Sequence, residues 1–207
     1  MTDAPVDRRR GRGRRPAAEV RSDVLRAAAD LLFEHGMPAM TFERIATTAG
    51  VSKMTLYKWW ASPGALALEA YFSAVEAQLA FPDSGDVARD LSDQLHAFVA
   101  LLTDRRVGRV IAELIGRTQT DPPLAAAFAA TYSLPRRRLA VERIGRGQQQ
   151  GQIAADVDPE VVVDQLWGAC YHRLLLPDQP LDAAFADALL RNVLTGITQT
   201  RPRQPSN

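Results

Sequence analysis

The chain has 207 residues, 46% of them hydrophobic, with 25 basic and 24 acidic side chains and a formal net charge of +1. This length fits one large domain or a small domain joined to a larger one, and the hydrophobic content excludes disorder throughout. The charge is unevenly placed: residues 1–16 hold six Arg against two Asp (+4), residues 17–64 are balanced at five and five, and residues 65–207 hold 14 basic and 17 acidic residues (−3). This asymmetry predicts that the N-terminal end meets a polyanion.

Cysteine use and hydropathy predict where the protein resides. Cys170 is the single cysteine, so no internal disulfide can form, and its apolar neighbours predict a buried thiol in a reducing compartment. No apolar run approaches the roughly 18 residues of a membrane span. Charged residues after Pro16 leave no apolar core for a signal peptide. We therefore expect a cytoplasmic protein with no membrane partner.

Residues 1–16 form a basic arm in which Gly11, Gly13 and Pro16 interrupt the arginines, a composition typical of flexible chain. The run 10–16 approximates the Arg-Gly-Arg-Pro core of an AT-hook, with one extra residue before the proline. Flexible arms of this kind place arginine in a narrow minor groove. An electrostatic tether without sequence preference is the alternative. The candidate DNA contacts of the arm are Arg12, Arg14 and Arg15.

After the arm, apolar residues recur every three to four positions, which predicts successive helices. The first is expected at 20–36, Thr41 and Ser52 can cap the next two, and Ser62-Pro63 can open a fourth. Later helices are expected at 87–102, around 107–115 with an end near Gly116, from 122 through 128, at 135–149, at 159–176 and at 182–199.

No stretch alternates with period two, so the fold is predicted to be all-α with about nine helices. The basic arm (1–16) precedes an N-terminal three-helix helix-turn-helix DNA-binding domain (17–64). A larger C-terminal helical bundle (65–200) follows, and the polar tail at 201–207 is expected to be disordered.

Residues 41–60 meet the physical requirements of a helix-turn-helix. Ile45 is expected on the buried face of the first helix, and Ala49 precedes the turn at Gly50. Leu56 is expected on the buried face of the second helix, where it anchors that helix to the domain. The first turn of such a helix reaches base edges in the major groove, while hydroxyls and lysines reach phosphates. A three-helix packing unit with incidental charge is the alternative. The predicted DNA contacts of this motif are Thr41, Arg44, Ser52, Lys53, Met54, Thr55, Tyr57, Lys58 and Trp59.

Thr41, the pair Ile45-Ala46, the run 49–52 (Ala-Gly-Val-Ser) and Leu56-Tyr57 stand at the spacing of a known signature. In these residues the chain resembles the TetR family of transcriptional regulators. The resemblance implies a homodimeric repressor that binds a palindromic operator on double-stranded DNA and releases it when a small molecule binds the C-terminal half. The family usually has a lysine after the serine that opens the fourth helix, and this chain has Pro63 there. That change removes a phosphate contact for which the arm can compensate.

On this interpretation residues 65–200 dimerise and bind a ligand. The family pairs its last two long helices, here 159–176 and 182–199, between subunits. The last helix carries two adjacent apolar faces, so that one can pack inward and one can meet a partner. A wider core stripe within one chain is the alternative. The predicted interface residues are Leu189, Leu190, Val193, Leu194 and Ile197.

The predicted ligand site is an apolar pocket between helices. Phe128 and Tyr132 are four residues apart, as are Trp167 and Tyr171, which makes two aromatic walls suited to an apolar or aromatic effector. Each of these residues could equally belong to an ordinary core. The candidate ligand contacts are Phe98, Leu102, Glu113, Phe128, Tyr132, Trp167, Tyr171 and His172.

The sequence offers little for other functions. Cys170 and His172 point to different faces of a helix, hydrolase and phosphate-loop motifs do not occur, and the histidines lack metal-ligand spacing. We therefore expect no enzyme, no cofactor and no metal. The run 136–138 (Arg-Arg-Arg) is predicted to be a solvated helix face rather than an anion site. The remaining alternative is a DNA-binding regulator without a small-molecule ligand, controlled by a protein partner or by its own abundance.

Deleting residues 1–15 is expected to weaken operator binding and to flatten its salt dependence. The deletion removes six arginines, and each phosphate contact contributes about −0.9 to the slope on duplex DNA. The measurement is the operator Kd of both proteins across a range of salt concentrations. An unchanged slope would contradict a role of the arm in DNA binding.

Overall fold

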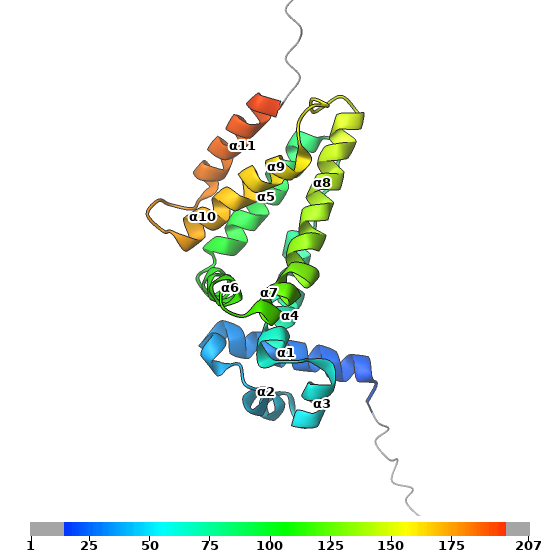
Figure 1. The fold of residues 1–207 in the computed structure, drawn as a ribbon, viewed down its shortest axis with the longest axis vertical. Helices are drawn as coiled ribbons and strands as arrows, with labels where there is room; N and C mark the ends of the chain where they lie inside the picture. The colour runs from blue at the N-terminus through cyan, green and yellow to red at the C-terminus, as the bar shows by residue number, and fades with distance from the viewer. Residues whose placement is uncertain (1–14, 198–207) are drawn as a thin grey trace, which may run out of the picture.

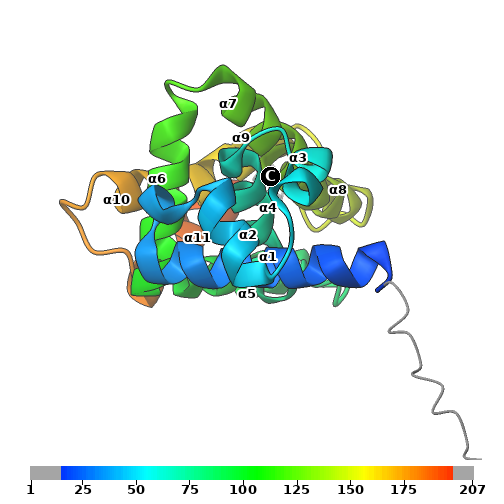
Figure 2. The same ribbon diagram turned by 90° about the horizontal axis from the view of Figure 1, so that it is seen from below.

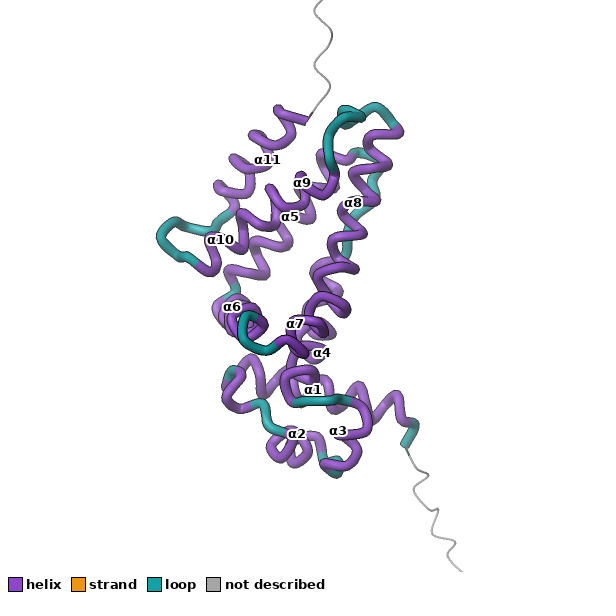
Figure 3. Tube along the Cα trace, in the orientation of Figure 1, coloured by secondary structure: helices purple, strands orange, loops and turns teal. Residues whose placement is uncertain are grey.

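This computed structural model describes residues 15–197, and each segment predicted to be helical is helical within them (Figure 3). The described part of the chain forms nine continuous helical rods and no strand, which confirms the all-α prediction. Arg12, Arg14 and the tail at 201–207 lie outside the described residues. None of the helices in residues 15–197 has both the length and the apolar character needed to cross a bilayer.

The N-terminal elements are α1 (Ala17–His35), η1 (Met37–Ala39), α2 (Phe42–Ala49), α3 (Lys53–Trp59), α4 (Pro63–Val75) and η2 (Glu76–Leu79). The C-terminal elements are α5 (Val87–Thr103), α6 (Arg105–Thr118), α7 (Pro122–Phe128), η3 (Ala129–Ser133), α8 (Leu134–Gln149), α9 (Pro159–Val163), η4 (Asp164–Gly168), α10 (Ala169–Leu175) and α11 (Ala183–Ile197). The elements η3 and η4 are π-helical turns, which join α7 to α8 and α9 to α10 as continuous rods.

Helix α6 departs from the sequence prediction at both ends. It begins at Arg105 because Asp104 accepts the backbone N–H groups of Arg106 and Val107 at 2.9 and 3.1 Å. It also runs through Gly116 to Thr118, although the glycine was expected to end it. A glycine inside a helix costs about 1 kcal/mol relative to alanine, which the buried apolar face of α6 offsets.

Helix α5 lies at the centre of the C-terminal half and packs against α6, α8 and α11 (Figure 1). The apolar stripe predicted for this segment is buried, including Leu91, Leu95, Phe98 and Leu102. Full burial of one such side chain stabilises a fold by about 1.5–3 kcal/mol. The stripe therefore fixes α5 as the core of the bundle that holds the candidate ligand site.

Helix α4 connects the two halves of the molecule. It begins at Pro63, where the side chain of Ser62 accepts the N–H of Ala65 at 3.1 Å. It packs against α1 in the N-terminal half and against α7 in the C-terminal half. Seen from the end that α2 and α3 occupy, α4 lies behind these two helices (Figure 2). A displacement of α4 would therefore be felt in both halves.

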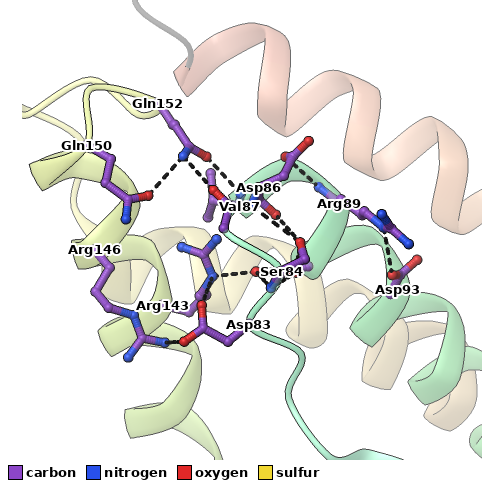
Figure 4. A network of polar contacts seen from close by, with 12 residues as sticks. Asp83, Ser84, Asp86, Val87, Arg89, Asp93, Arg143, Arg146, Gln150 and Gln152 are labelled. Atoms are coloured by element: carbon purple, nitrogen blue, oxygen red, sulfur yellow. Dashed lines mark hydrogen bonds and ion pairs between the residues drawn. The ribbon is translucent and has the colours of Figure 1, made fainter.

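A fully buried ion pair joins α5 to α8. The Nε of Arg143 lies 2.5 Å from Oδ2 of Asp90, and Ser84 donates its hydroxyl to the same carboxylate at 2.6 Å (Figure 4). Burial alone would raise the pKa of Asp90, but the hydrogen bonds from Ser84 and Arg143 outweigh it and hold that pKa below its usual value. This pair positions the loop before α5 against α8.

Replacing Arg143 with alanine is expected to lower the free energy of unfolding by about 3–5 kcal/mol, because Asp90 then stays buried without its cation. Denaturant unfolding measures the loss. The matched control is Arg146→Ala, since Arg146 is exposed and pairs with Asp83 at 3.3 Å; that change should cost less than about 1 kcal/mol. Equal losses in the two variants would contradict the importance of the buried pair.

Candidate DNA-binding surface and interhelical cavity

Two caps and one glycine shape the helix-turn-helix. Thr41 caps α2 by accepting the N–H of Arg44 at 3.3 Å, and Ser52 caps α3 by accepting the N–H of Thr55 at 3.2 Å. Between the helices, Gly50 has a φ of 64°, a left-handed conformation that glycine adopts without strain. The turn is therefore encoded locally.

Helix α3 turns a polar and aromatic face to solvent, while Leu56 is fully buried behind it. Met54 is 76% exposed and Tyr57 is 58% exposed. The ring of Tyr57 packs edge-on against Phe42 of α2 with centroids 4.7 Å apart, which orients its phenol. Of the predicted contacts in α3, Lys53, Met54, Tyr57 and Lys58 are exposed, and Thr55 and Trp59 are half-buried. Such a face has the residue types that a recognition helix presents to the major groove.

The two lysines of this helix differ in their surroundings. The Nζ of Lys53 lies 2.9 Å from Oε1 of Glu43 on α2, and this contact lowers the pKa of Glu43 and raises that of Lys53. Both groups are exposed, so water weakens the pair. Lys58 has no ion-pair partner among residues 15–197. DNA therefore competes with Glu43 for Lys53, whereas Lys58 has no such competitor among the described residues.

A cluster that sequence reasoning missed fixes the C-terminal end of α3. The indole N–H of Trp60 donates to Oε2 of Glu69 on α4 at 2.7 Å. Arg21 of α1 donates to the same oxygen at 2.8 Å and lies over the Trp60 ring, 5.0 Å from its centroid. Three helices thus meet at one carboxylate, and this contact sets the position of α3 relative to α4.

The other predicted DNA contacts occupy the same end of the molecule. Arg44 is exposed on α2, and Thr41 is half-buried because its hydroxyl caps that helix. Arg15, the first described residue, forms an ion pair with Asp23 of α1. Its guanidinium is therefore turned toward α1.

A cavity of about 250 Å³ lies between α5, the α7–α8 rod and the α9–α10 rod. Tyr132 and Tyr171 approach each other across it, with their hydroxyl oxygens 3.5 Å apart. Phe98 packs edge-on against Tyr171 at 5.3 Å between centroids. Five of the predicted ligand contacts line this cavity, namely Phe98, Phe128, Tyr132, Trp167 and Tyr171.

Both π-helical turns border the cavity. The turn η3 contributes Tyr132 and Ser133, and the turn η4 contributes Asp164, Trp167 and Gly168. A π-turn adds a residue to the helical repeat and is frequent at functional sites. Here the two turns carry Tyr132 and Trp167, one from each of the aromatic pairs that the sequence spacing indicated.

Three predicted ligand contacts lie outside the wall of this cavity. Leu102 is buried in the core at the C-terminal end of α5, where its apolar side chain packs. Glu113 of α6 accepts the backbone N–H of Met37 at 3.0 Å and so joins α6 to the N-terminal half. His172 is exposed on α10 and borders a separate surface depression beside Phe185.

The arginine run on α8 is not the solvated face that the sequence predicts, since only Arg138 is exposed. Arg137 is half-buried and forms ion pairs with Glu160 and Asp164, the latter at 2.6 Å. Arg136 is half-buried in the cavity wall. The prediction was wrong for these two residues because the α9–α10 rod covers this part of α8.

Comparison with known proteins agrees with this layout. The family model for bacterial regulatory proteins of the tetR family matches residues 24–70, and the model for a tetracyclin repressor-like C-terminal domain matches residues 81–193. The HTH-type transcriptional regulator YdeS of Bacillus subtilis is 34% identical over 189 residues, which cover 91% of this chain and 95% of YdeS. The chain belongs to the TetR family of transcriptional regulators.

Two solved structures extend the comparison. The TetR family regulator SCO0332 is 55% identical, with a TM-score of 0.79 over 87% of this chain and 100% of that one. The flavonoid-responsive regulator FrrA is 25% identical, with a TM-score of 0.62 over 90% of this chain and 100% of that one. As a TetR-family member, the protein is a DNA-binding transcription regulator and not an enzyme.

In this TetR-family regulator the last helix, α11, packs with one face on α5. Leu190 and Val193 are buried, 5% and 8% exposed, whereas Leu189 and Leu194 are half-buried. Ile197 ends the described part of the helix. Leu189 and Leu194 also pack against the core with part of their surface, so the two-face pattern and the wider core stripe both stay open. Whether this surface meets a second copy stays a prediction.

Replacing Lys53 with alanine is expected to lower operator affinity and to alter base preference, because the first turn of a recognition helix contacts base edges. Tyr57→Phe and Lys58→Ala should weaken binding to all sequences similarly, since contacts to phosphates carry no sequence information. Competition binding with operator variants measures both quantities. If Lys53→Ala leaves affinity and preference intact, the assigned recognition face is wrong.

The matched variant Glu43→Gln keeps Lys53 and removes its partner. It should raise affinity for DNA, because DNA then no longer competes with a carboxylate for Lys53. A second exposed glutamate, Glu34 on α1, serves as a control in Glu34→Gln. An equal gain in both variants would show a general charge effect and contradict a specific role of the Lys53–Glu43 pair.

Proposed function

We propose that this regulator is a homodimeric repressor that binds a palindromic operator through α3 and releases it when a small molecule occupies the cavity. The observation that carries the proposal is the contact between the cavity and α4. The ring of Phe72 on α4 stacks on Tyr132 in the cavity wall, with centroids 3.9 Å apart and planes 5° apart. Tyr132 thus lines the cavity and also contacts α4, the helix that connects the C-terminal bundle to α3.

This contact offers a route for the response. Phe128, also in the cavity wall, packs on Phe72 at 5.8 Å, so two lining residues bear on the same side chain of α4. A ligand shifts an equilibrium only by the difference of its affinities for the two states. Coupling free energies are typically about 1–3 kcal/mol, which corresponds to roughly 5–150-fold in affinity. A modest preference of the ligand for a displaced Tyr132 is therefore sufficient.

A second contact between the halves runs through α6. Glu113 accepts the N–H of Met37 at 3.0 Å, just after the C-terminal end of α1. A Cβ on Gly36 would lie 3.2 Å from the same carboxylate, so the close approach favours glycine there. With α4 and α6 both bound to α1, the DNA-binding helices sense the arrangement of the C-terminal bundle at two points.

The dimer rests on the apolar surface of α11 and its neighbours. Leu189 and Leu194 are half-buried beside the side of α11 that meets α5, and Val161 of α9 is 49% exposed. Exposed apolar faces on adjacent helices are typical of isologous interfaces. Two copies related by a two-fold axis would present two α3 helices to one palindrome. We place this function in the cytoplasm, where the chromosome of a bacterium lies.

The competing proposal is regulation without a small molecule. It assigns no role to the aromatic-lined cavity of about 250 Å³. FrrA, 25% identical, is described as flavonoid-responsive. That relative supports a response to a planar small molecule here. The aromatic lining supports the same class of effector.

Selection of bound DNA from a random duplex pool tests the proposal. We expect a palindrome whose half-site centres lie one helical turn, about 10 bp, or a multiple of it apart, because each subunit of a dimer reads one half-site. Size-exclusion chromatography with light scattering should give twice the chain mass. A non-palindromic or unselected pool would contradict the dimeric repressor.

A further inference from the structure

Among the described residues, one charged side chain in the cavity wall, Arg136, has no ion-pair partner. Ser133, Arg136 and Ala140 lie three or four residues apart and therefore share one face of the α7–α8 rod, which all three present to the cavity. Arg136 is the middle member of this set. Arg136 is half-buried and lines the same cavity as Phe128, Tyr132 and Tyr171.

The neighbouring arginines show what Arg136 lacks. Arg137 is compensated by Glu160 and Asp164, and Arg138 is exposed to water. Arg136 has no ion pair, hydrogen bond or cation–π contact with any residue in 15–197. Burial lowers the pKa of its guanidinium, and the opposing electrostatic effects of Tyr132, Tyr171 and the more distant Glu76 offset this only in part. The cation is thus partly desolvated without a partner.

A hydrogen-bond donor stands beside this cation. Tyr132 lies four residues before Arg136 on the same rod, and its hydroxyl accepts a hydrogen bond from Tyr171 at 3.5 Å. The Tyr132 proton is therefore free to be donated to a ligand. Burial raises the pKa of both phenols, so both remain protonated donors at neutral pH.

A partly buried guanidinium and a phenol O–H favour an anionic acceptor, and arginine matches a carboxylate through two parallel hydrogen bonds. Aromatic side chains make up much of the remaining wall, among them Phe98, Phe128 and Trp167. The wall also holds Asp164, whose carboxylate is paired with Arg137 at 2.6 Å. The cavity volume of about 250 Å³ is below the roughly 300–1,000 Å³ of sites for drug-sized ligands. The space fits one or two fused rings.

We propose that the cavity binds a small planar aromatic acid, whose carboxylate pairs with Arg136 and accepts from Tyr132 while its ring packs against the aromatic wall. This inference names the effector class of the proposed function and rests on it only for the consequence of binding. The acid site itself is a property of the isolated protein.

Calorimetry on the full-length protein without DNA tests the acid site. The probes are 2-naphthoate and its neutral isostere 2-naphthamide, with benzoate and benzamide as a smaller pair. We expect each acid to bind about tenfold or more tightly than its amide, the difference that one charge-assisted contact supplies. Arg136→Gln should abolish this preference, and Tyr132→Phe should reduce it.

Arg138→Gln is the matched control, because Arg138 is exposed on the same helix, and it should leave the preference unchanged. Retained binding of 2-naphthamide shows that Arg136→Gln is folded; the comparison of acid with amide on the unaltered protein needs no variant. Equal or tighter binding of the amides overturns the proposal, as does failure of both acids to bind at millimolar concentration. If 2-naphthoate binds through Arg136 but leaves operator affinity unchanged, the acid site stands and the ligand-responsive function fails.

Discussion

The stack of Phe72 on Tyr132 is the contact on which the ligand response proposed for this regulator depends. Phe72 belongs to α4, whose other residues pack against α1, while Tyr132 belongs to the wall of the cavity. Interiors are closely packed, so a displaced aromatic ring moves its neighbour rather than compressing it. The cavity and α3 thus lie near opposite ends of α4.

Charged side chains in the two halves of this molecule differ in how deeply they are buried. At the DNA-binding end, cations are exposed, and Lys53 is held only by a solvated contact with Glu43. In the bundle, the buried pair of Arg143 and Asp90 is compensated and serves the fold. Arg136 alone combines partial burial, a cavity position and no partner within residues 15–197. That combination is the reason why we propose Arg136, rather than Arg143, as a ligand-binding group.

Much of the fold could be predicted from the sequence because its signals are local. Thr41, Gly50 and Ser52 act through their own backbone neighbours, so the helix-turn-helix could be located by spacing alone. Tertiary effects could not be predicted in this way. The cover that the α9–α10 rod gives to α8 arises from packing between segments distant in the sequence, and the two π-turns depart from the regular helical repeat. The sequence predicted that Arg136 faces water, but in the structure it lines the cavity. The spacing of the aromatic residues had already indicated several other members of the cavity wall.

The most direct test of communication through α4 is the ratio of operator Kd with and without a saturating cavity ligand, measured in Phe72→Leu and in the original protein. Leucine keeps an apolar side chain but loses a flat stack worth about 0.5–1.5 kcal/mol. We predict that the ratio falls by roughly two- to tenfold while affinity without ligand changes little. Phe33→Leu is the control, since Phe33 packs on Tyr71 away from the cavity. An unchanged ratio in Phe72→Leu, or an equal fall in Phe33→Leu, would contradict the account.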